Sequence, residues 1–451
     1  MHRVRVTTDF YFVPTRLLWP NWEAWIAGDS DVQAPYVVFE DDPPIGSIAD
    51  YLGMPVTGLV DSGVRVSPLP FAAYCKIWNE YYRDQNLQGP IADQVSNGNN
   101  LTVWGTFGGT SPLRRAWQHD YFTAALPFAQ KGDAVQVPLV QQDDIPVEFV
   151  TKPGGETYIR QPNSGALMEG GGFDSDPDGV FTVDAPGTTN AAYDPNGTLV
   201  VDVQAGATDI NTLRRAFRLQ EWLERNARGG TRYVENILSH FGVRSKDSRL
   251  QRPEFIQRIR QNMVISEVLS TAQTDADSVI TPVGQLAGHG ISVGGSGNIR
   301  YRATEHGYIF GIINVQPDTA YMQGLHRQFT RFDRLDYAWP TFANLGEQEI
   351  LGKELYLGGS AEAEEVFGYI PRYSEYKYLA SRVSGDMRGN LSFWHLARIF
   401  ESQPALNEQF IKCDPGKRIF AVQGEDDSIY AHIFLGIDAV RKLPRFGVPT
   451  I

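Results

Sequence analysis

The sequence has 451 residues, of which 42% are hydrophobic and 21% are charged, which is typical of a folded chain and excludes a disordered one. The formal net charge of -13 argues against a protein that binds nucleic acid over its whole surface, because phosphate neutralisation needs clustered lysine and arginine. Two cysteines, Cys75 and Cys413, are too few for a disulfide framework, and we expect two buried thiols in a reducing compartment.

Residues 3–14 open the chain with a regular alternation of side chains. One face carries Val4, Val6, Thr8, Phe10 and Phe12, and Pro14 ends the pattern. This period of two predicts a half-buried strand. The same alternation predicts further strands at 135–139, 299–303, 308–312 and 429–437.

The sequence shows neither an export signal nor a membrane-spanning stretch. The stretch MHRVRVTTDF has no apolar signal core, and the longest apolar run, at 308–315, is far shorter than a spanning helix. We therefore predict neither an exported nor a membrane protein.

Three helices are predicted between the strands. The first begins near Pro70, carries aromatic residues at three- and four-residue steps, and stops before Gly89 and Pro90. The second covers 209–228 and stops at a glycine pair, and the third covers 233–241 and ends at Gly242. Strands spread over the whole length with few helices favour a β-sandwich or jelly roll with long insertions over a doubly wound fold.

The segment 141–208 differs in composition from its neighbours. It holds ten glycines and eleven acids against Lys152 and Arg160, and it includes the predicted short strands VEFV, GVFTVD and TLVVDV. We interpret it as an excursion that faces solvent.

The sign of the charge reverses directly after this segment. Residues 209–262 hold twelve basic and six acidic side chains, so we expect two surfaces with different partners. The candidate DNA-contact residues on the 209–228 helix are Arg214, Arg215, Arg218 and Arg225. Glu221 lies three residues after Arg218, so an ion pair within the helix competes with phosphate.

Patterns of catalytic or metal-binding residues are sparse. The glycine-rich stretch 105–112 lacks the Lys-Ser/Thr of a phosphate-binding loop, no serine lies in a GxSxG motif, and the eight histidines form no HExxH motif. Adjacent acids such as Asp143 and Asp144 point apart on a strand, which does not define a glycosidase pair. We therefore predict no enzyme activity, no catalytic residues, no metal and no cofactor.

Long stretches of the chain resemble, in collinear order, the major capsid proteins of small single-stranded-DNA phages, the Microviridae, and especially their gokushovirus-like branch. The stretches are HRVRVTTDFYFVPTRLLWPNW, GSIADYLGMP, LPFAAYCKIWNEYYRDQNLQ, HDYFTAALPFAQKG, GGTRYVENILSHFGVRSKDSRLQRPEF, RLDYAWPTFANLGEQEI, FGYIPRYSEYKY and FGVPT. Family members usually carry a segment before the counterpart of HRVRV, and this sequence begins there with Met1.

The resemblance implies one capsid domain over 1–451, mainly β, built as an eight-stranded antiparallel jelly roll with long loop insertions that carry several helices. Sixty copies would form a T=1 icosahedral shell around circular single-stranded DNA. The segment 141–208 would be a variable surface insertion that meets a host receptor, with Asp174, Asp176 and Asp178 as its candidate host-contact residues. Further implied partners are an internal scaffolding protein and a DNA pilot protein, with assembly in the bacterial cytoplasm, location in the virion and no membrane.

The stretch WNEYYRDQN at 78–86 combines a helical stripe of rings with charges. We interpret it as a packing and assembly helix, with aromatic core packing as an almost equal explanation. Its assembly candidates are Trp78, Tyr81, Tyr82 and Arg83. Two other functions compete with the capsid hypothesis: a carbohydrate-binding jelly-roll spike or lectin-like protein, and a glycoside hydrolase on a β scaffold.

Overall fold

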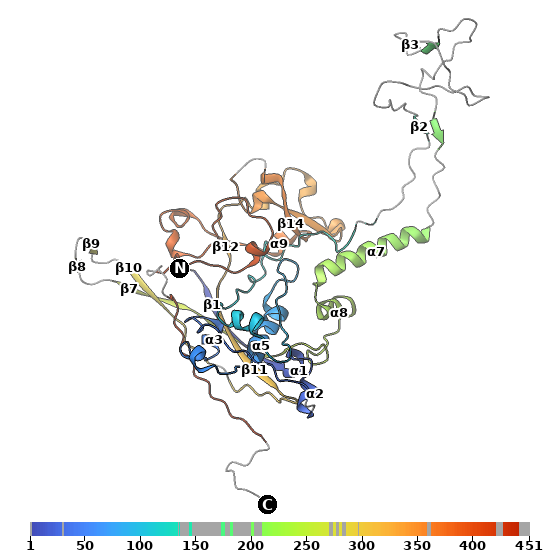
Figure 1. Cartoon of the computed structure of the whole chain (residues 1–451). Coiled ribbons are helices and arrows are strands. Elements are labelled where there is room, and N and C mark those ends of the chain that lie inside the picture. Colours follow the sequence, from blue (N-terminus) through green and yellow to red (C-terminus); the bar gives the residue numbers. More distant parts are fainter. Residues whose placement is uncertain are drawn as a thin grey trace, which may run out of the picture. The chain divides into compact units, whose positions relative to one another are not determined.

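The computed structural model describes residues 2–28, 31–133, 135, 210–269, 286–295, 297–358, 362–420 and 427–441, and the backbone of short strands between these ranges (Figure 1). The chain divides into two compact units. One comprises Met1–Lys131 with Glu224–Ile451, and the other is Gly132–Leu223.

The main sheet of the first unit has three antiparallel strands in the order β11-β1-β6. They are β1 (Val4–Pro14), β6 (Glu254–Asn262) and β11 (Gly307–Pro317). β1 pairs with β11 from Val4 opposite Pro317 to Pro14 opposite Gly307, and with β6 along its other edge. The strands predicted at 3–14 and 308–312 are confirmed.

The two faces of β1 have different surroundings. Tyr11 and Val13, which point to one face, are fully buried in the larger core cluster. The apolar face that the sequence pattern emphasises is only partly covered: opposite β1 on this face, Ile309 and Ile313 of β11 are 62% and 38% exposed. The period of two is therefore correct, while the deepest burial lies on the face of Tyr11.

The larger core packs helices and loops of the first 110 residues against this sheet. Its central helix, α5 (Leu69–Ile77), continues as the π-helix η1 (Trp78–Tyr82) and buries Phe71 and Ile77. This confirms the first predicted helix, which ends at Tyr82 rather than near Gly89. The smaller elements are α1 (Thr15–Leu18), α2 (Trp22–Ile26), α3 (Ile48–Tyr51), α4 (Leu59–Ser62), η2 (Leu101–Gly105) and α6 (Thr106–Gly108).

A second core lies among later elements of the same unit. Tyr121, Phe122 and Tyr321 pack there with Ile350 and Leu355, the last two fully buried. Its strands and helices are β12 (Ala320–Tyr321), β13 (Glu347–Leu351), β14 (Val366–Pro371), α9 (Ser374–Lys377), β15 (Ser381–Arg382) and α10 (Glu408–Ile411). The 3-10 helices are η3 (Arg327–Phe329), η4 (Arg334–Asp336), η5 (Pro340–Phe342), η6 (Gly352–Glu354), η7 (Glu362–Glu364), η8 (Gly385–Arg388) and η9 (Ser392–Trp394).

The other two predicted helices are confirmed as α7 (Ile210–Gly229) and α8 (Tyr233–Phe241). Gly242 ends α8 with a left-handed φ of 67°, which glycine adopts without a steric cost. Short antiparallel pairs complete the described strands: β2 (Asp144–Pro146) with β5 (Val200–Asp202), β3 (Phe173–Ser175) with β4 (Phe181–Val183), β7 (Val264–Leu269) with β10 (Leu286–Ile291), and β8 (Thr274–Ala276) with β9 (Val279–Thr281).

Two predicted strands are wrong in the described chain. Residues 299–303 form none, because the ladder of β1 and β11 stops at Gly307; Tyr301 instead packs 5.2 Å from the Phe12 ring and donates a hydrogen bond to Glu254. Residues 429–437 form none either, and Tyr430 and Phe434 are 84% and 89% exposed. Most of 135–139, and the stretch VEFV, lie outside the described residues.

The fold is thus mainly antiparallel sheet with helices between the strands, which agrees with the predicted mainly β class. Both cysteines are free and buried, as predicted. Burial raises the pKa of the Cys413 thiol to about 11, so this group stays protonated and unreactive at neutral pH.

Candidate functional site

The stretch Trp78–Arg83 lies against the sheet rather than on the surface. Trp78 and Tyr82 are 6% and 5% exposed. The indole Nε1 of Trp78 donates to the carbonyl of Arg114 at 3.2 Å. The π-helical turn, closed by a bond from the Arg83 amide to the Trp78 carbonyl at 3.0 Å, brings both rings to the same buried side.

Tyr82 reaches a buried carboxylate in the middle of β1. Its hydroxyl donates to Asp9 at 2.7 Å, and the side chain of Asp9 is fully buried. Arg258 of β6 donates to both carboxylate oxygens, at 2.6 and 2.8 Å. This bidentate pair neutralises the buried charge, and the hydrogen bonds to Asp9 raise the pKa of Arg258 above its ordinary value.

Further groups surround this ion pair. The Tyr11 hydroxyl donates to that of Tyr82 at 3.2 Å, and burial raises the pKa of Tyr11 to about 12. The guanidinium of Arg115 lies 5.1 Å from the centre of the Tyr82 ring and donates to Asn314 of β11 at 2.9 Å. Residues of β1, β6, β11 and η1 thus converge on one polar cluster inside an apolar core.

Tyr81 connects the same turn to the segment before β6, and Arg83 connects it to the start of α8. The Tyr81 hydroxyl donates to the carbonyl of Pro253 at 2.5 Å, and the Arg252 guanidinium stacks 4.4 Å from the ring. The carbonyl of Arg83 accepts a bond from Arg232 at 3.0 Å. All four assembly candidates therefore have contacts within their own chain, Trp78 and Tyr82 in the core and Tyr81 and Arg83 half-buried.

The four DNA-contact candidates lie on α7 with exposed side chains. Arg218 forms the expected intrahelical pair with Glu221, at 2.6 Å, while its side chain stays 83% exposed. Pairs at such exposure contribute little to stability, so this one can be exchanged for another anion. The structure does not test DNA contact, which stays a prediction.

The three host-contact candidates are not placed by the structure. Asp174 belongs to the backbone of β3, and Asp176 and Asp178 lie outside the described residues. The segment 141–208 that contains them falls within the compact unit Gly132–Leu223.

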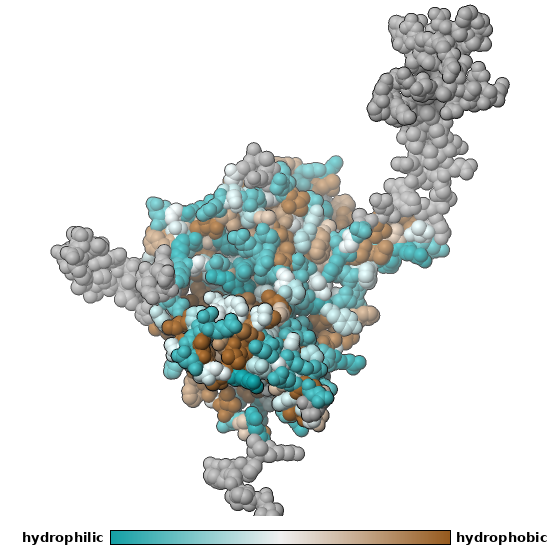
Figure 2. Space-filling view, in the orientation of Figure 1, coloured by the Kyte–Doolittle hydropathy of each residue, from teal (hydrophilic) through white to brown (hydrophobic). Residues whose placement is uncertain are grey.

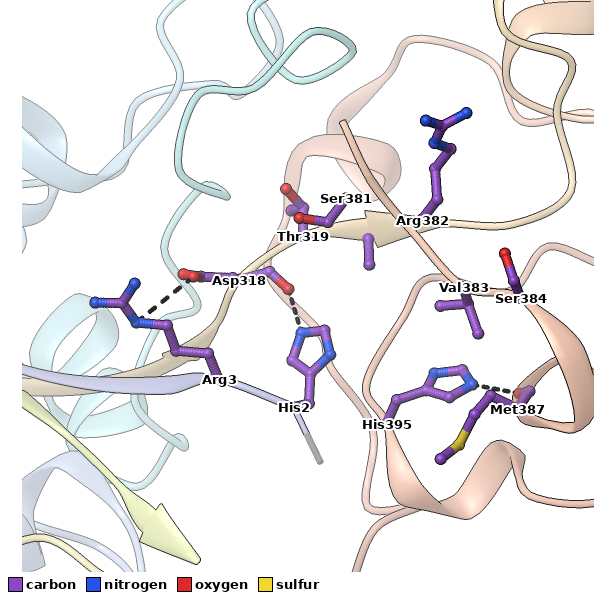
Figure 3. A pocket seen from close by; sticks show the side chains of 11 residues that line it. His2, Arg3, Asp318, Thr319, Ser381, Arg382, Val383, Ser384, Met387 and His395 are labelled. Atoms are coloured by element: carbon purple, nitrogen blue, oxygen red, sulfur yellow. Dashed lines mark hydrogen bonds and ion pairs between the residues drawn. The ribbon is translucent and has the colours of Figure 1, made fainter. Parts of the chain in front are cut away.

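A surface hollow of about 320 Å³ at the start of β1 is lined by two histidines, His2 and His395 (Figure 3). His2 bonds to the carbonyl of Asp318, whose carboxylate is ion-paired with Arg5 at 2.7 Å. His395 uses both ring nitrogens, on the carbonyl of Met387 at 2.7 Å and the amide of Ala397 at 3.1 Å. These partners occupy the groups that general acid–base chemistry would need.

Neither a metal cluster nor a spanning helix occurs in the part of the chain that the structure describes. No group of three His, Cys, Asp or Glu side chains gathers there to hold an ion. No helix among those residues is long and apolar enough to cross a membrane.

Comparison with known proteins identifies the family of the chain. The profile of one family, described as capsid protein (F protein), matches residues 1–451. The chain belongs to this capsid protein family. It is a structural virion protein and not an enzyme, and the lectin-like and glycosidase hypotheses are not favoured.

Curated relatives of this capsid protein agree over nearly its whole length. It is 36% identical to capsid protein VP1 of Bdellovibrio phage phiMH2K, with 100% of this chain and 86% of that protein covered. The VP1 proteins of Chlamydia phage 1 and Spiroplasma virus 4 are 33% and 30% identical, with 100% and 99% of this chain and 87% and 85% of those proteins covered. The resemblance to Microviridae capsid proteins is confirmed.

The cluster around Asp9 predicts that replacing one carboxylate oxygen of Asp9 by an amide nitrogen strongly lowers the stability of the subunit. In Asp9→Asn the amide cannot neutralise Arg258, so a guanidinium is left unpaired beside the core. We expect the free energy of unfolding of the unassembled subunit to fall by about 3 kcal/mol. Urea denaturation followed by tryptophan fluorescence measures this.

Glu221→Gln, which breaks the exposed pair with Arg218, is the matched control and should change the free energy of unfolding by less than about 1 kcal/mol. Equal effects of the two variants would contradict the central role of the Asp9 pair.

Proposed function

We propose that this capsid protein is the subunit of a T=1 icosahedral shell in which sixty copies enclose a circular single-stranded DNA genome. The observation that carries the proposal is the match to the capsid family over residues 1–451. The architecture of the chain supports it, because a rigid core with exposed apolar side chains suits a subunit that is completed by its neighbours.

We expect the purified protein to form closed particles of about 3 MDa, since each chain has a mass of 50.3 kDa. Electron microscopy and light scattering under assembly conditions measure size and symmetry. A protein that stays monomeric, or forms small oligomers that bind glycans, would contradict the proposal and favour a lectin-like function.

We also propose that the fold is completed as an eight-stranded jelly roll over 1–451. One observation supports a second sheet: the partly exposed apolar face of the β11-β1-β6 sheet, where Ile309 and Ile313 reach the surface. Jelly rolls bury such faces between two packed sheets. A reconstruction of the particles in which no second sheet covered this face would contradict this topology.

For the genome, we propose contact through Arg214, Arg215, Arg218 and Arg225. Their exposure on α7 supports this, as does the overall charge of -13, because an acidic chain needs a local basic surface to hold DNA. The proposal requires this face of the helix to be turned toward the interior of the shell.

Charge reversal at Arg214 and Arg218 should lower the packaged DNA several-fold while particle yield stays near that of the unmodified protein. The ratio of absorbance at 260 and 280 nm of purified particles measures packaged DNA. The matched control reverses the exposed Arg300 and Arg302. Equal loss of particles and DNA in the helix variant would instead indicate a structural role of the arginines.

For the host, we propose that the insertion 141–208, with Asp174, Asp176 and Asp178, projects outward and meets a receptor. Its composition of eleven acids and ten glycines supports an exposed role, and so does its position in a separate compact unit. An internal scaffolding protein and a DNA pilot protein are further proposed partners, with assembly in the bacterial cytoplasm.

Deletion of residues 153–201 should leave particle formation intact and reduce attachment to host cells by at least about tenfold, because the core lies elsewhere. Particle counts and a cell-binding assay measure the two effects separately. Loss of folding on deletion would contradict the surface assignment.

Contact between copies at Trp78, Tyr81, Tyr82 and Arg83 remains part of the proposal in a restricted form. The buried Trp78 and Tyr82 would fix the conformation of the turn, and only the half-buried Tyr81 and Arg83 would contact a neighbouring copy.

A further inference from the structure

Exposed large apolar side chains gather in two segments of the described chain. Apolar residues reach the surface in several separate places in Figure 2, and along the sequence they are dense at 429–437, which forms neither helix nor strand, and in the loop 329–339. In this aromatic loop the exposed fractions are 59% for Phe329, 91% for Phe332, 52% for Leu335, 52% for Tyr337 and 48% for Trp339. Water contact of so many rings is unfavourable for an isolated subunit.

The backbone of the aromatic loop is nevertheless held in one conformation. The Asp336 carboxylate accepts bonds from the amides of Phe332 at 2.9 Å and Asp333 at 2.8 Å. These bonds hold the pKa of Asp336 below its ordinary value, so the carboxylate is charged and the turn persists at neutral pH. The Trp339 indole donates to the carbonyl of Arg334 at 2.8 Å and closes the loop.

Side chains from α9 and the residue before it anchor the aromatic loop to the subunit. The guanidinium of Arg331 lies 4.2 Å from the centre of the Tyr376 ring and 3.5 Å from the buried carboxylate of Glu375. The amide of Trp339 donates to the Tyr373 hydroxyl at 3.2 Å. The loop is therefore pre-organised, with its rings outward.

Pre-organised aromatic side chains are the groups that bind a protein partner most strongly. Little conformational entropy is lost when they are buried, and Trp, Tyr and Arg dominate the centres of interfaces. The charged residues Asp333, Arg334 and Asp336 lie between the rings, which suits the polar rim of a protein interface better than a lipid surface.

A hollow of about 400 Å³ lies at the base of the loop, lined by Arg331 of the loop and by Tyr376 of α9. A protruding ring, Phe332, directly after a residue that lines a hollow makes this region self-complementary. Self-complementary patches pair isologously, as copies do across the twofold axes of a shell.

We propose that the aromatic loop 329–339 is a contact between neighbouring copies of this chain in the shell. The inference rests on the self-assembly that membership of the capsid family implies, and it names the surface by which one copy holds the next.

The test uses two double variants. The loop variant carries Phe332→Ser and Leu335→Ser, and the control variant carries Ile45→Ser and Val64→Ser. The control pair removes exposed apolar side chains of 84% and 53% exposure far along the sequence from the loop. The side chains of Phe332 and Leu335 are hydrocarbon, so their replacement leaves the hydrogen bonds of Asp336 to the turn in place. The loop variant should fold as a subunit, by circular dichroism and thermal melting, and its critical concentration for assembly should rise at least about tenfold. The control should assemble like the unmodified protein.

Oxidative footprinting of the unmodified protein gives a second reading that does not depend on folding of a variant. Modification of Phe332, Tyr337 and Trp339 should fall several-fold from free subunits to particles. Unchanged modification, or normal assembly of a folded loop variant, would overturn the inference and leave the loop facing solvent in the shell. Failure of the unmodified protein to form particles would instead count against the capsid function itself.

Discussion

A buried charge in the central strand sets the arrangement of this subunit. Asp9 lies on β1 with no exposed side-chain surface, and it needs Arg258 of β6 and Tyr82 of η1 together to satisfy its oxygens. A shift of β1 by one residue would turn Asp9 away from both partners, because successive side chains of a strand point to opposite faces. The pair therefore favours one strand register and one position of η1, because another register would leave a buried charge without its partner.

Charged and aromatic side chains that are buried within the subunit are not accessible for contacts between copies. The stretch around Trp78 is committed to the core of its own subunit, where its rings cover the face of β1 that carries Tyr11. The surfaces left with exposed apolar side chains are others, among them the loop 329–339. A shell subunit benefits from this division, since a rigid interior presents outward rings in a fixed geometry and lowers the entropic cost of association.

The sequence predicted local elements well and non-local ones poorly. Helices α7 and α8 were predicted nearly to the residue, because side-chain periodicity, caps and stop glycines act within a few turns. The strands expected at 299–303 and 429–437 are not formed, since alternation describes a side-chain pattern and a strand also needs a neighbour to receive its backbone hydrogen bonds. The sequence did not show whether Trp78 and Tyr82 pack in the core or at an interface, because both roles produce a helical stripe of aromatic residues.

The sequence by itself determined the capsid family, the mainly β class, the positions of the long helices, and the contrast between the acidic segment 141–208 and the basic residues after it. Only the tertiary structure decided that the face of Tyr11 is the deeply buried side of β1, that Arg258 is the partner of Asp9 across 249 residues, and that the rings of 329–339 point to solvent. The reason is physical. Family motifs and helical periods are written in neighbouring residues, whereas burial and ion pairing depend on segments that meet only after the chain has folded.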